Sequence, residues 1–244
     1  MRLVAPLLVA LLVVPAFGAE EPLEPPFPRP NPSATDEKLE SLSEQVDTPE
    51  PLELEPVDEA ALAECEDKLR SLGAEFERLP AITDETDKGC GIGAPYNLSR
   101  VAPDVVLEPA SQMTCETALA LTRWVNDTLL PAVEVLGDNV RLTRIVHGST
   151  YICRRRNNQT GGKISEHALG RAVDILSFGF DGRNPVAVIP RAGDGNLAES
   201  FQRAARGGAC LYFTTVLGPG SDAFHNDHLH LDILSRNRGF RLCQ

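Results

Sequence analysis

The chain has 244 residues, of which 42% are hydrophobic, and it carries a formal net charge of -12. This length allows one large domain or one domain with tails. Thirteen acidic and two basic residues lie between Glu20 and Glu59, so this segment carries most of the negative charge. The rest of the chain is nearly neutral, which excludes the extended basic surface of a nucleic-acid-binding protein.

The N-terminal segments predict an exported protein. Arg2 precedes an apolar run over residues 3–17, and two small residues follow, which is the layout of a secretory signal peptide over residues 1–19. The run is shorter than the roughly 20 residues of a membrane helix, so we expect no stable membrane span after cleavage; an uncleaved anchor is the alternative. Residues 20–57 are rich in proline and glutamate and predict a disordered linker, which is a candidate contact for an envelope partner.

Beyond the linker, the pattern of apolar and capping residues predicts one folded domain over residues 58–244. Asp58 and Thr114 are suited to cap helices, because a short polar side chain at this position accepts a hydrogen bond from the first helical turn. Helices are expected over residues 59–70, 115–130 and 196–206.

Alternating and β-rich segments predict a sheet. Pro103 lacks a backbone N–H group, so we assign the strand expected around it to a sheet edge. The strands are expected over residues 76–79, 101–107, 140–147, 171–178 and 211–216. Together with the helices they predict an α+β fold with a mostly antiparallel sheet and flanking helices.

Six cysteines and no Cys-x-x-Cys pair indicate disulfides formed in an oxidising compartment. Six cysteines allow 15 pairings, and the sequence does not choose among them. We expect pairing in chain order, which gives Cys65 with Cys90, Cys115 with Cys153, and Cys210 with Cys243.

The segment from His225 to Asp232 holds three of the five histidines. His228 and His230 alternate with two leucines, and a strand would place both imidazoles on one face and both leucines in the core. A polar face rich in metal ligands would then lie above a buried one.

A fourth histidine, His167, lies upstream with a carboxylate at Asp174. Two imidazoles, one carboxylate and an open position for water form the first coordination shell of a catalytic zinc ion. The alternative is that these histidines are core or surface residues without a common role. The clustering favours the metal, since histidine is the commonest metal ligand.

Two motifs carry a resemblance to known proteins. The pattern Ser-x-His-x-x-Gly-x-Ala-x-Asp over residues 165–174, followed by His-x-His, resembles the zinc peptidases grouped with lysostaphin, D-alanyl-D-alanine carboxypeptidases and hedgehog domains. The spacing His-x-x-His-x-His over residues 225–230 is most similar to the penicillin-insensitive murein endopeptidases. Residues 65–243 also resemble the extensin-like C-terminal domain family, whose name supplies no reaction.

The resemblance implies that His167, Asp174 and His230 bind Zn2+, with water in the fourth position. It makes His228 the candidate general base or transition-state donor, and His225 a residue that orients His228 or binds substrate.

The related carboxypeptidases carry a glutamate three residues before the last histidine, and Asp227 stands in that place here. Asp227 is therefore the alternative base to His228. Arg154 matches an arginine that contacts the substrate carbonyl in the related enzymes, although Arg154 to Arg156 could equally form an ordinary solvated basic turn.

These expectations lead to a hypothesis of function. The chain is predicted to be a periplasmic or secreted zinc peptidase of the bacterial envelope that cuts peptidoglycan cross-links or stem peptides, with D,D-endopeptidase activity preferred. Its expected partner is a peptidoglycan peptide, and no binding of nucleic acid is expected. One alternative is a non-catalytic wall-binding module that retains the peptidase fold, and another is a zinc hydrolase of other peptides or amides.

Overall fold

The structure is a computed structural model that describes residues 57–156, 161–191 and 193–244. The predicted signal peptide and nearly all of the predicted linker lie outside these residues. Within the described part of the chain, no helix is both long enough and apolar enough to cross a membrane.

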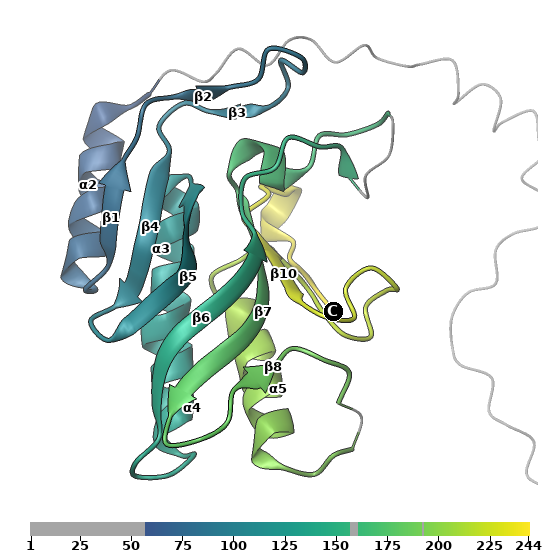
Figure 1. Cartoon of the computed structure of the whole chain (residues 1–244). Helices are drawn as coiled ribbons and strands as arrows, with labels where there is room; N and C mark the ends of the chain where they lie inside the picture. Colours follow the sequence, from purple (N-terminus) through teal and green to yellow (C-terminus); the bar gives the residue numbers. More distant parts are fainter. Residues whose placement is uncertain (1–56, 157–160, 192) are drawn as a thin grey trace, which may run out of the picture. The chain divides into compact units, whose positions relative to one another are not determined.

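A single sheet of nine strands forms the centre of the described chain (Figure 1). Its order is β1-β4-β5-β6-β7-β10-β9-β11, and β8 pairs with β7. The pairs β5–β6 and β9–β11 are parallel and the others are antiparallel. The strands are β1 (Glu75–Arg78), β4 (Tyr96–Ala102), β5 (Val105–Met113), β6 (Arg141–Ser149), β7 (Ala172–Asp181), β8 (Val186–Ala187), β9 (Thr215–Leu217), β10 (Leu229–Asp232) and β11 (Leu242–Cys243). A separate small sheet pairs β2 (Ile82–Thr83) with β3 (Gly91–Ile92).

Helices pack behind the sheet in the view of Figure 1. The predicted caps are confirmed: Asp58 accepts from the N–H groups of Ala60 and Ala61, and Thr114 accepts from that of Thr117. The long helix expected from residue 115 contains one π-helical segment, η1, before Pro131. The helices are α2 (Glu59–Ser71), α3 (Cys115–Trp124), η1 (Val125–Leu129), α4 (Leu130–Glu134) and α5 (Leu197–Ala209), with short 3-10 turns η3 (Glu166–Leu169) and η4 (Asn237–Gly239).

Aromatic residues fill the core between the helices and the sheet. Trp124 is fully buried and meets Phe178 and Phe213 edge to face, while its indole N–H donates to the Ala205 carbonyl at 2.9 Å. Burial of each large apolar side chain contributes about 1.5–3 kcal/mol. The contacts of Trp124 join α3 to α5 and to β7, and the helices cover one face of the sheet.

Two strand predictions are wrong. The strand expected over residues 211–216 is present only from Thr215, where β9 begins, and residues 211–214 form turns after α5. The expected edge strand over residues 101–107 is a hairpin in which Pro103 and Asp104 connect β4 to β5. Proline lacks a backbone donor, and this property suits a turn as well as an edge, so the sequence pattern did not separate the two. The strands around residues 140–147 and 171–178 are confirmed as β6 and β7.

Two of the three expected disulfides are also wrong. The bonds join Cys65 to Cys115, Cys90 to Cys153, and Cys210 to Cys243, so only the last follows chain order. The Cys65–Cys115 bond ties α2 to the first residue of α3, a contact that only the tertiary packing creates. An α+β fold with a mostly antiparallel sheet and disulfides is confirmed, and its disulfides fit an oxidising compartment.

Candidate metal centre

Three elements bring the predicted ligands together. Strands β7 and β10 are antiparallel neighbours, and their register places His230 directly opposite Asp174. His167 lies in η3, which leads directly into β7. The two motifs therefore meet at one end of the β7–β10 pair, as the sequence predicted.

The local sequence of η3 explains the position of His167. The hydroxyl of Ser165 accepts from the His167 N–H group and caps the turn, and Gly170 ends it with a φ of 65°. A Cβ atom at Gly170 would lie 2.3 Å from Cδ1 of Ile92, so both the dihedral angle and the space require glycine.

The ligand atoms of His167, Asp174 and His230 form a compact triangle. Asp174 Oδ1 lies 2.9 Å from His230 Nδ1 and 3.2 Å from His167 Nε2, and the two nitrogens are 3.1 Å apart. Zinc bonds of about 2.0–2.1 Å at tetrahedral angles separate ligand atoms by about 3.3 Å. The triangle therefore has the size that a zinc ion requires, and these are residues that could hold one.

The outer nitrogens of the two histidines determine where their protons lie. His167 Nδ1 is 2.8 Å from the Thr150 carbonyl oxygen, and His230 Nε2 is 3.1 Å from Asp232 Oδ2. Both oxygens are acceptors, so in the neutral state of each imidazole the outer nitrogen carries the proton. His167 Nε2 and His230 Nδ1 then each turn a lone pair toward Asp174 Oδ1.

Three acceptors that face one another repel unless a cation or a proton lies between them. Burial opposes a charge on His230, but hydrogen bonds with Asp174 and Asp232 outweigh it and raise its pKa to about 9. Burial also opposes ionisation of Asp174, but its bonds with His167 and His230 hold its pKa well below the usual value. The donor set of two imidazoles and one carboxylate thus fits a divalent zinc ion.

Hydrogen bonds from neighbouring residues hold the candidate ligands in place. The sequence motifs did not identify these neighbours. The Ser149 hydroxyl donates to Asp174 Oδ2 at 2.8 Å, and the Thr150 carbonyl holds His167 as described above. Asp232 lies two residues beyond His230 on β10, and the period of two in a strand could have identified it. No sequence signal could have identified the Thr150 carbonyl, because any residue supplies one.

A disulfide secures the segment that carries Thr150. Cys153 is bonded to Cys90, and the Ile152 N–H group donates to the His167 carbonyl at 3.4 Å. Asp87 lies near this disulfide, but the bonded sulfurs offer no thiolate, so this second cluster is no metal site.

His228 and Asp227 form a pair beside the triangle. His228 precedes the first residue of β10, so it is not within the strand as predicted, yet its Nε2 atom lies 3.8 Å from Asp174 Oδ1. Its Nδ1 atom is 2.8 Å from Asp227 Oδ1. The Asp227 side chain is 82% exposed, so the imidazole rather than the carboxylate adjoins the metal ligands.

His225 belongs to the same group of rings. Its centroid lies 5.1 Å from that of His228 and 5.7 Å from that of His230, and its Nδ1 atom is 2.7 Å from Asp222 Oδ1. Burial lowers the pKa of His225 despite the opposing effect of Asp222.

A backbone hydrogen bond determines the position of Arg154. Its carbonyl accepts from the Ser165 N–H group at 3.1 Å, which brings the arginine segment beside the start of η3. Arg155 pairs with Asp87 and Arg156 with Glu166, whereas the Arg154 guanidinium has no hydrogen bond or ion pair within the described residues. Among the described residues, no hydrogen bond or ion pair therefore joins the Arg154 side chain to the candidate ligands.

The fifth histidine, His147, contacts the backbone and not the candidate ligands. His147 is buried in β6, and its Nε2 atom lies 2.7 Å from the Pro109 carbonyl oxygen. Burial lowers its pKa, which favours the neutral imidazole.

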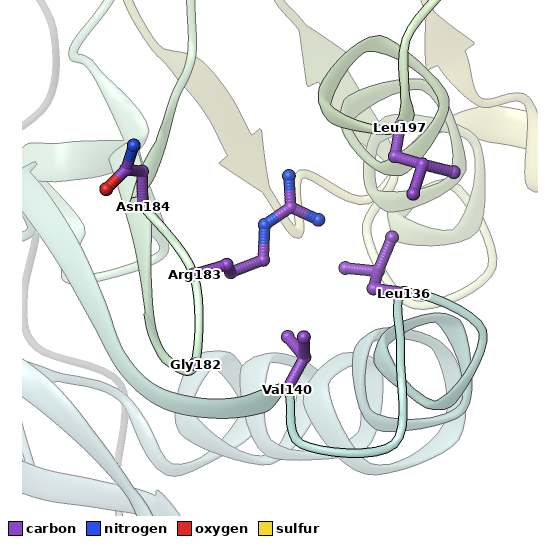
Figure 2. A pocket seen from close by; sticks show the side chains of 6 residues that line it. All are labelled: Leu136, Val140, Gly182, Arg183, Asn184 and Leu197. Carbon is purple, nitrogen blue, oxygen red and sulfur yellow. The ribbon is translucent and has the colours of Figure 1, made fainter.

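A shallow hollow lies at the other end of β7 from Asp174. Figure 2 shows Arg183, which follows this strand, extending between apolar side chains. The guanidinium also lies 5.4 Å from the centre of the Phe180 ring. The lining residues are Leu136, Val140, Gly182, Arg183, Asn184 and Leu197, none of which belongs to the predicted site.

Fold and site together define an α+β protein with three disulfides whose sheet carries a cluster of histidines and carboxylates. The chain belongs to the family described as extensin-like protein C-terminus, whose model matches residues 63–244. Neither a comparison with curated proteins nor one with solved structures gives a match.

Proposed function

We propose that this protein is a zinc-dependent peptidase that cuts peptidoglycan cross-links or stem peptides. The observation that carries the proposal is the convergence of His167 Nε2, Asp174 Oδ1 and His230 Nδ1, with the imidazole of His228 beside them. Zinc bound there would activate a water molecule and polarise the scissile carbonyl.

The chain's own residues would hold the ligands in place for this chemistry. The Ser149 hydroxyl and the Thr150 carbonyl fix Asp174 and His167, so neither ligand has to reorient when the metal binds. Ligand orientation of this kind contributes to metal affinity through the partners of the outer ring nitrogens.

His228 is the residue that we propose for proton transfer. Its Nε2 atom faces the cluster, while Asp227 accepts from Nδ1–H and thereby leaves the Nε2 lone pair available. Nε2 can accept a proton from the attacking water and donate it to the leaving amine. Asp227 is then a positioning residue, and His225, held by Asp222, adjoins His228 and would orient it or bind substrate.

The substrate class rests on the motifs. The resemblance of residues 165–174 and 225–230 to murein peptidases favours a D,D-endopeptidase, and the predicted export would place the protein in the periplasm or outside the cell. The Arg154 guanidinium, which has no partner among the described residues, is available for a substrate carbonyl. The predicted linker remains a candidate contact for an envelope partner.

The test is digestion of purified cross-linked muropeptides, followed by mass spectrometry. We expect cross-linked dimers to be converted to monomers, activity to cease after removal of metal by a chelator, and activity to return with one equivalent of zinc. Cleavage that persists after exhaustive chelation would contradict the proposal.

Asp227 is exposed and stands in the place where the carboxypeptidases that the motifs resemble carry glutamate. This favours one rival function, a wall-binding module without turnover. Sedimentation with insoluble peptidoglycan separates the two. Binding that is unchanged after substitution of the metal ligands, together with no cleavage under any metal condition, would favour the module.

A further inference from the structure

A chain of hydrogen bonds leads from the C-terminal segment to His230. Arg236 donates from Nη2 to the Thr215 hydroxyl oxygen at 2.6 Å, and that hydroxyl lies 2.6 Å from Asp232 Oδ1. The other oxygen of Asp232 lies 3.1 Å from His230 Nε2. Four side chains thus connect in one line, and the line ends at a ligand of the candidate metal centre.

The donor inventory of the side chains gives this line a direction. A guanidinium only donates, so the Thr215 oxygen accepts from Arg236 and must use its single proton toward Asp232. Asp232 Oδ1 also accepts from the Leu234 N–H group at 3.0 Å. Both of these donors act on Oδ1, and Oδ2 is the oxygen that faces His230 Nε2.

Strand pairing and burial make the arrangement rigid. Asp232 and His230 are two residues apart on β10, and Thr215 is the direct partner of Asp232 on β9. Asp232 is 5% exposed and Thr215 is 3% exposed. A buried carboxylate keeps its charge only where donors surround it, and each of the donors described here has a fixed position.

We propose that Asp232 is a positioning residue that keeps the proton of His230 on Nε2 and so presents Nδ1 to zinc, with Thr215 and Arg236 fixing the carboxylate. This inference rests on the zinc site of the proposed function but not on the reaction. It assigns a role to three residues outside the ligand set.

Asp232→Asn is the most informative substitution. The Leu234 N–H group and the Thr215 hydroxyl both require an acceptor, so the amide oxygen must take the place of Oδ1. The amide NH2 group then faces His230 Nε2 and forces this nitrogen to accept. The proton moves to Nδ1 and blocks the metal position.

Adjacent threonines offer a matched control. Thr215→Val removes the hydroxyl that contacts the Asp232 carboxylate, whereas Thr214→Val removes one that contacts the main-chain carbonyls of Asp232 and Leu234 at 3.2 and 2.7 Å. Each variant loses one hydroxyl, at Thr215 in the first position of β9 or at Thr214 just before it, so a general loss of stability would affect them alike.

The experiment measures zinc affinity by competition with a chromophoric chelator. We expect Asp232→Asn to weaken binding about 10- to 100-fold, the range for second-shell partners, and Thr215→Val to weaken it less but in the same direction. Thr214→Val should bind like the parent protein. Nitrogen-15 spectra of zinc-loaded, histidine-labelled protein should show His230 bound through Nδ1 in the parent, with this signal reduced in Asp232→Asn.

Two results would overturn the inference: parent-like zinc affinity in folded Asp232→Asn, or equal losses in the two threonine variants. A parent protein that binds zinc with the expected order of variants but cuts no muropeptide would remove the proposed reaction and leave this inference standing. Failure of the positioning role would conversely leave cleavage by the parent intact.

Discussion

The two pairs of histidines in the cluster are held in different ways. His167 and His230 have outer nitrogens fixed by a main-chain carbonyl and by a buried carboxylate, whereas His225 and His228 are held by Asp222 and Asp227, which are 43% and 82% exposed. The inner pair is therefore held by groups inside the fold, whereas the outer pair is held by carboxylates that reach solvent. Under the proposed function, this difference would separate metal binding from proton transfer.

The largest expected effect follows from removing the negative charge of Asp174, the carboxylate between His167 and His230. Asp174→Asn replaces the only carboxylate ligand, so we expect zinc affinity to fall by more than the about 100-fold typical of outer partners, and cleavage to be lost with it. Equilibrium dialysis with metal analysis measures the first effect. If this variant retained one tightly bound zinc, Asp174 would not be a ligand as proposed.

The next effect concerns the outer pair. His228→Gln should lower the rate of muropeptide cleavage about 100- to 10,000-fold, the usual contribution of general acid–base catalysis, because no other imidazole is in its place. Zinc affinity should change little. Asn226→Ala, in the same loop, is the matched control and should cleave like the parent. A His228→Gln variant that loses zinc would show that this imidazole is a ligand instead.

The pKa of His230 predicts how the metal-free protein responds to pH. A pKa raised to about 9 means that the folded state gains stability from the proton below pH 6.5, and loses it as pH rises through 9. The loss is about 3 kcal/mol at most, at about 1.4 kcal/mol for each pKa unit.

Urea unfolding of chelated protein at pH 6, 8 and 10 measures this change in the free energy of unfolding. His230→Gln should remove most of the pH dependence in this range, since glutamine does not titrate. An unchanged slope in that variant would assign the effect to another group.

The smallest effect is expected at Asp227. Asp227→Asn breaks an exposed pair, which contributes at most about 1 kcal/mol, so cleavage should fall by no more than about fivefold. The ratio kcat/KM measured on muropeptides tests this. A loss as large as that of His228→Gln would make Asp227 the base and reverse the proposed roles.

The sequence identified the candidate ligands because their positions follow simple rules. His230 and Asp174 lie on strands whose alternation could be predicted, and the motif around His167 matched a known pattern in full. Asp232 shares the strand face of His230, but the sequence does not show that its carboxylate contacts the outer nitrogen of that histidine.

Other features depended on tertiary contacts that no local pattern specifies. The pairing of Cys65 with Cys115 requires α2 to lie against α3, and the hairpin at Pro103 requires β4 and β5 to be central neighbours. The Thr150 carbonyl that orients His167 belongs to the main chain, and its use depends only on where the segment after β6 passes.

Gly170 limits how this sequence can vary without losing the centre. Its left-handed backbone and its closeness to Ile92 leave no room for a side chain, and the turn that it ends carries His167. A homologue with alanine at this position would need a smaller residue in place of Ile92 as well as a strained backbone. Inspection of these two positions together would therefore separate homologues able to keep the imidazole in register from those that cannot.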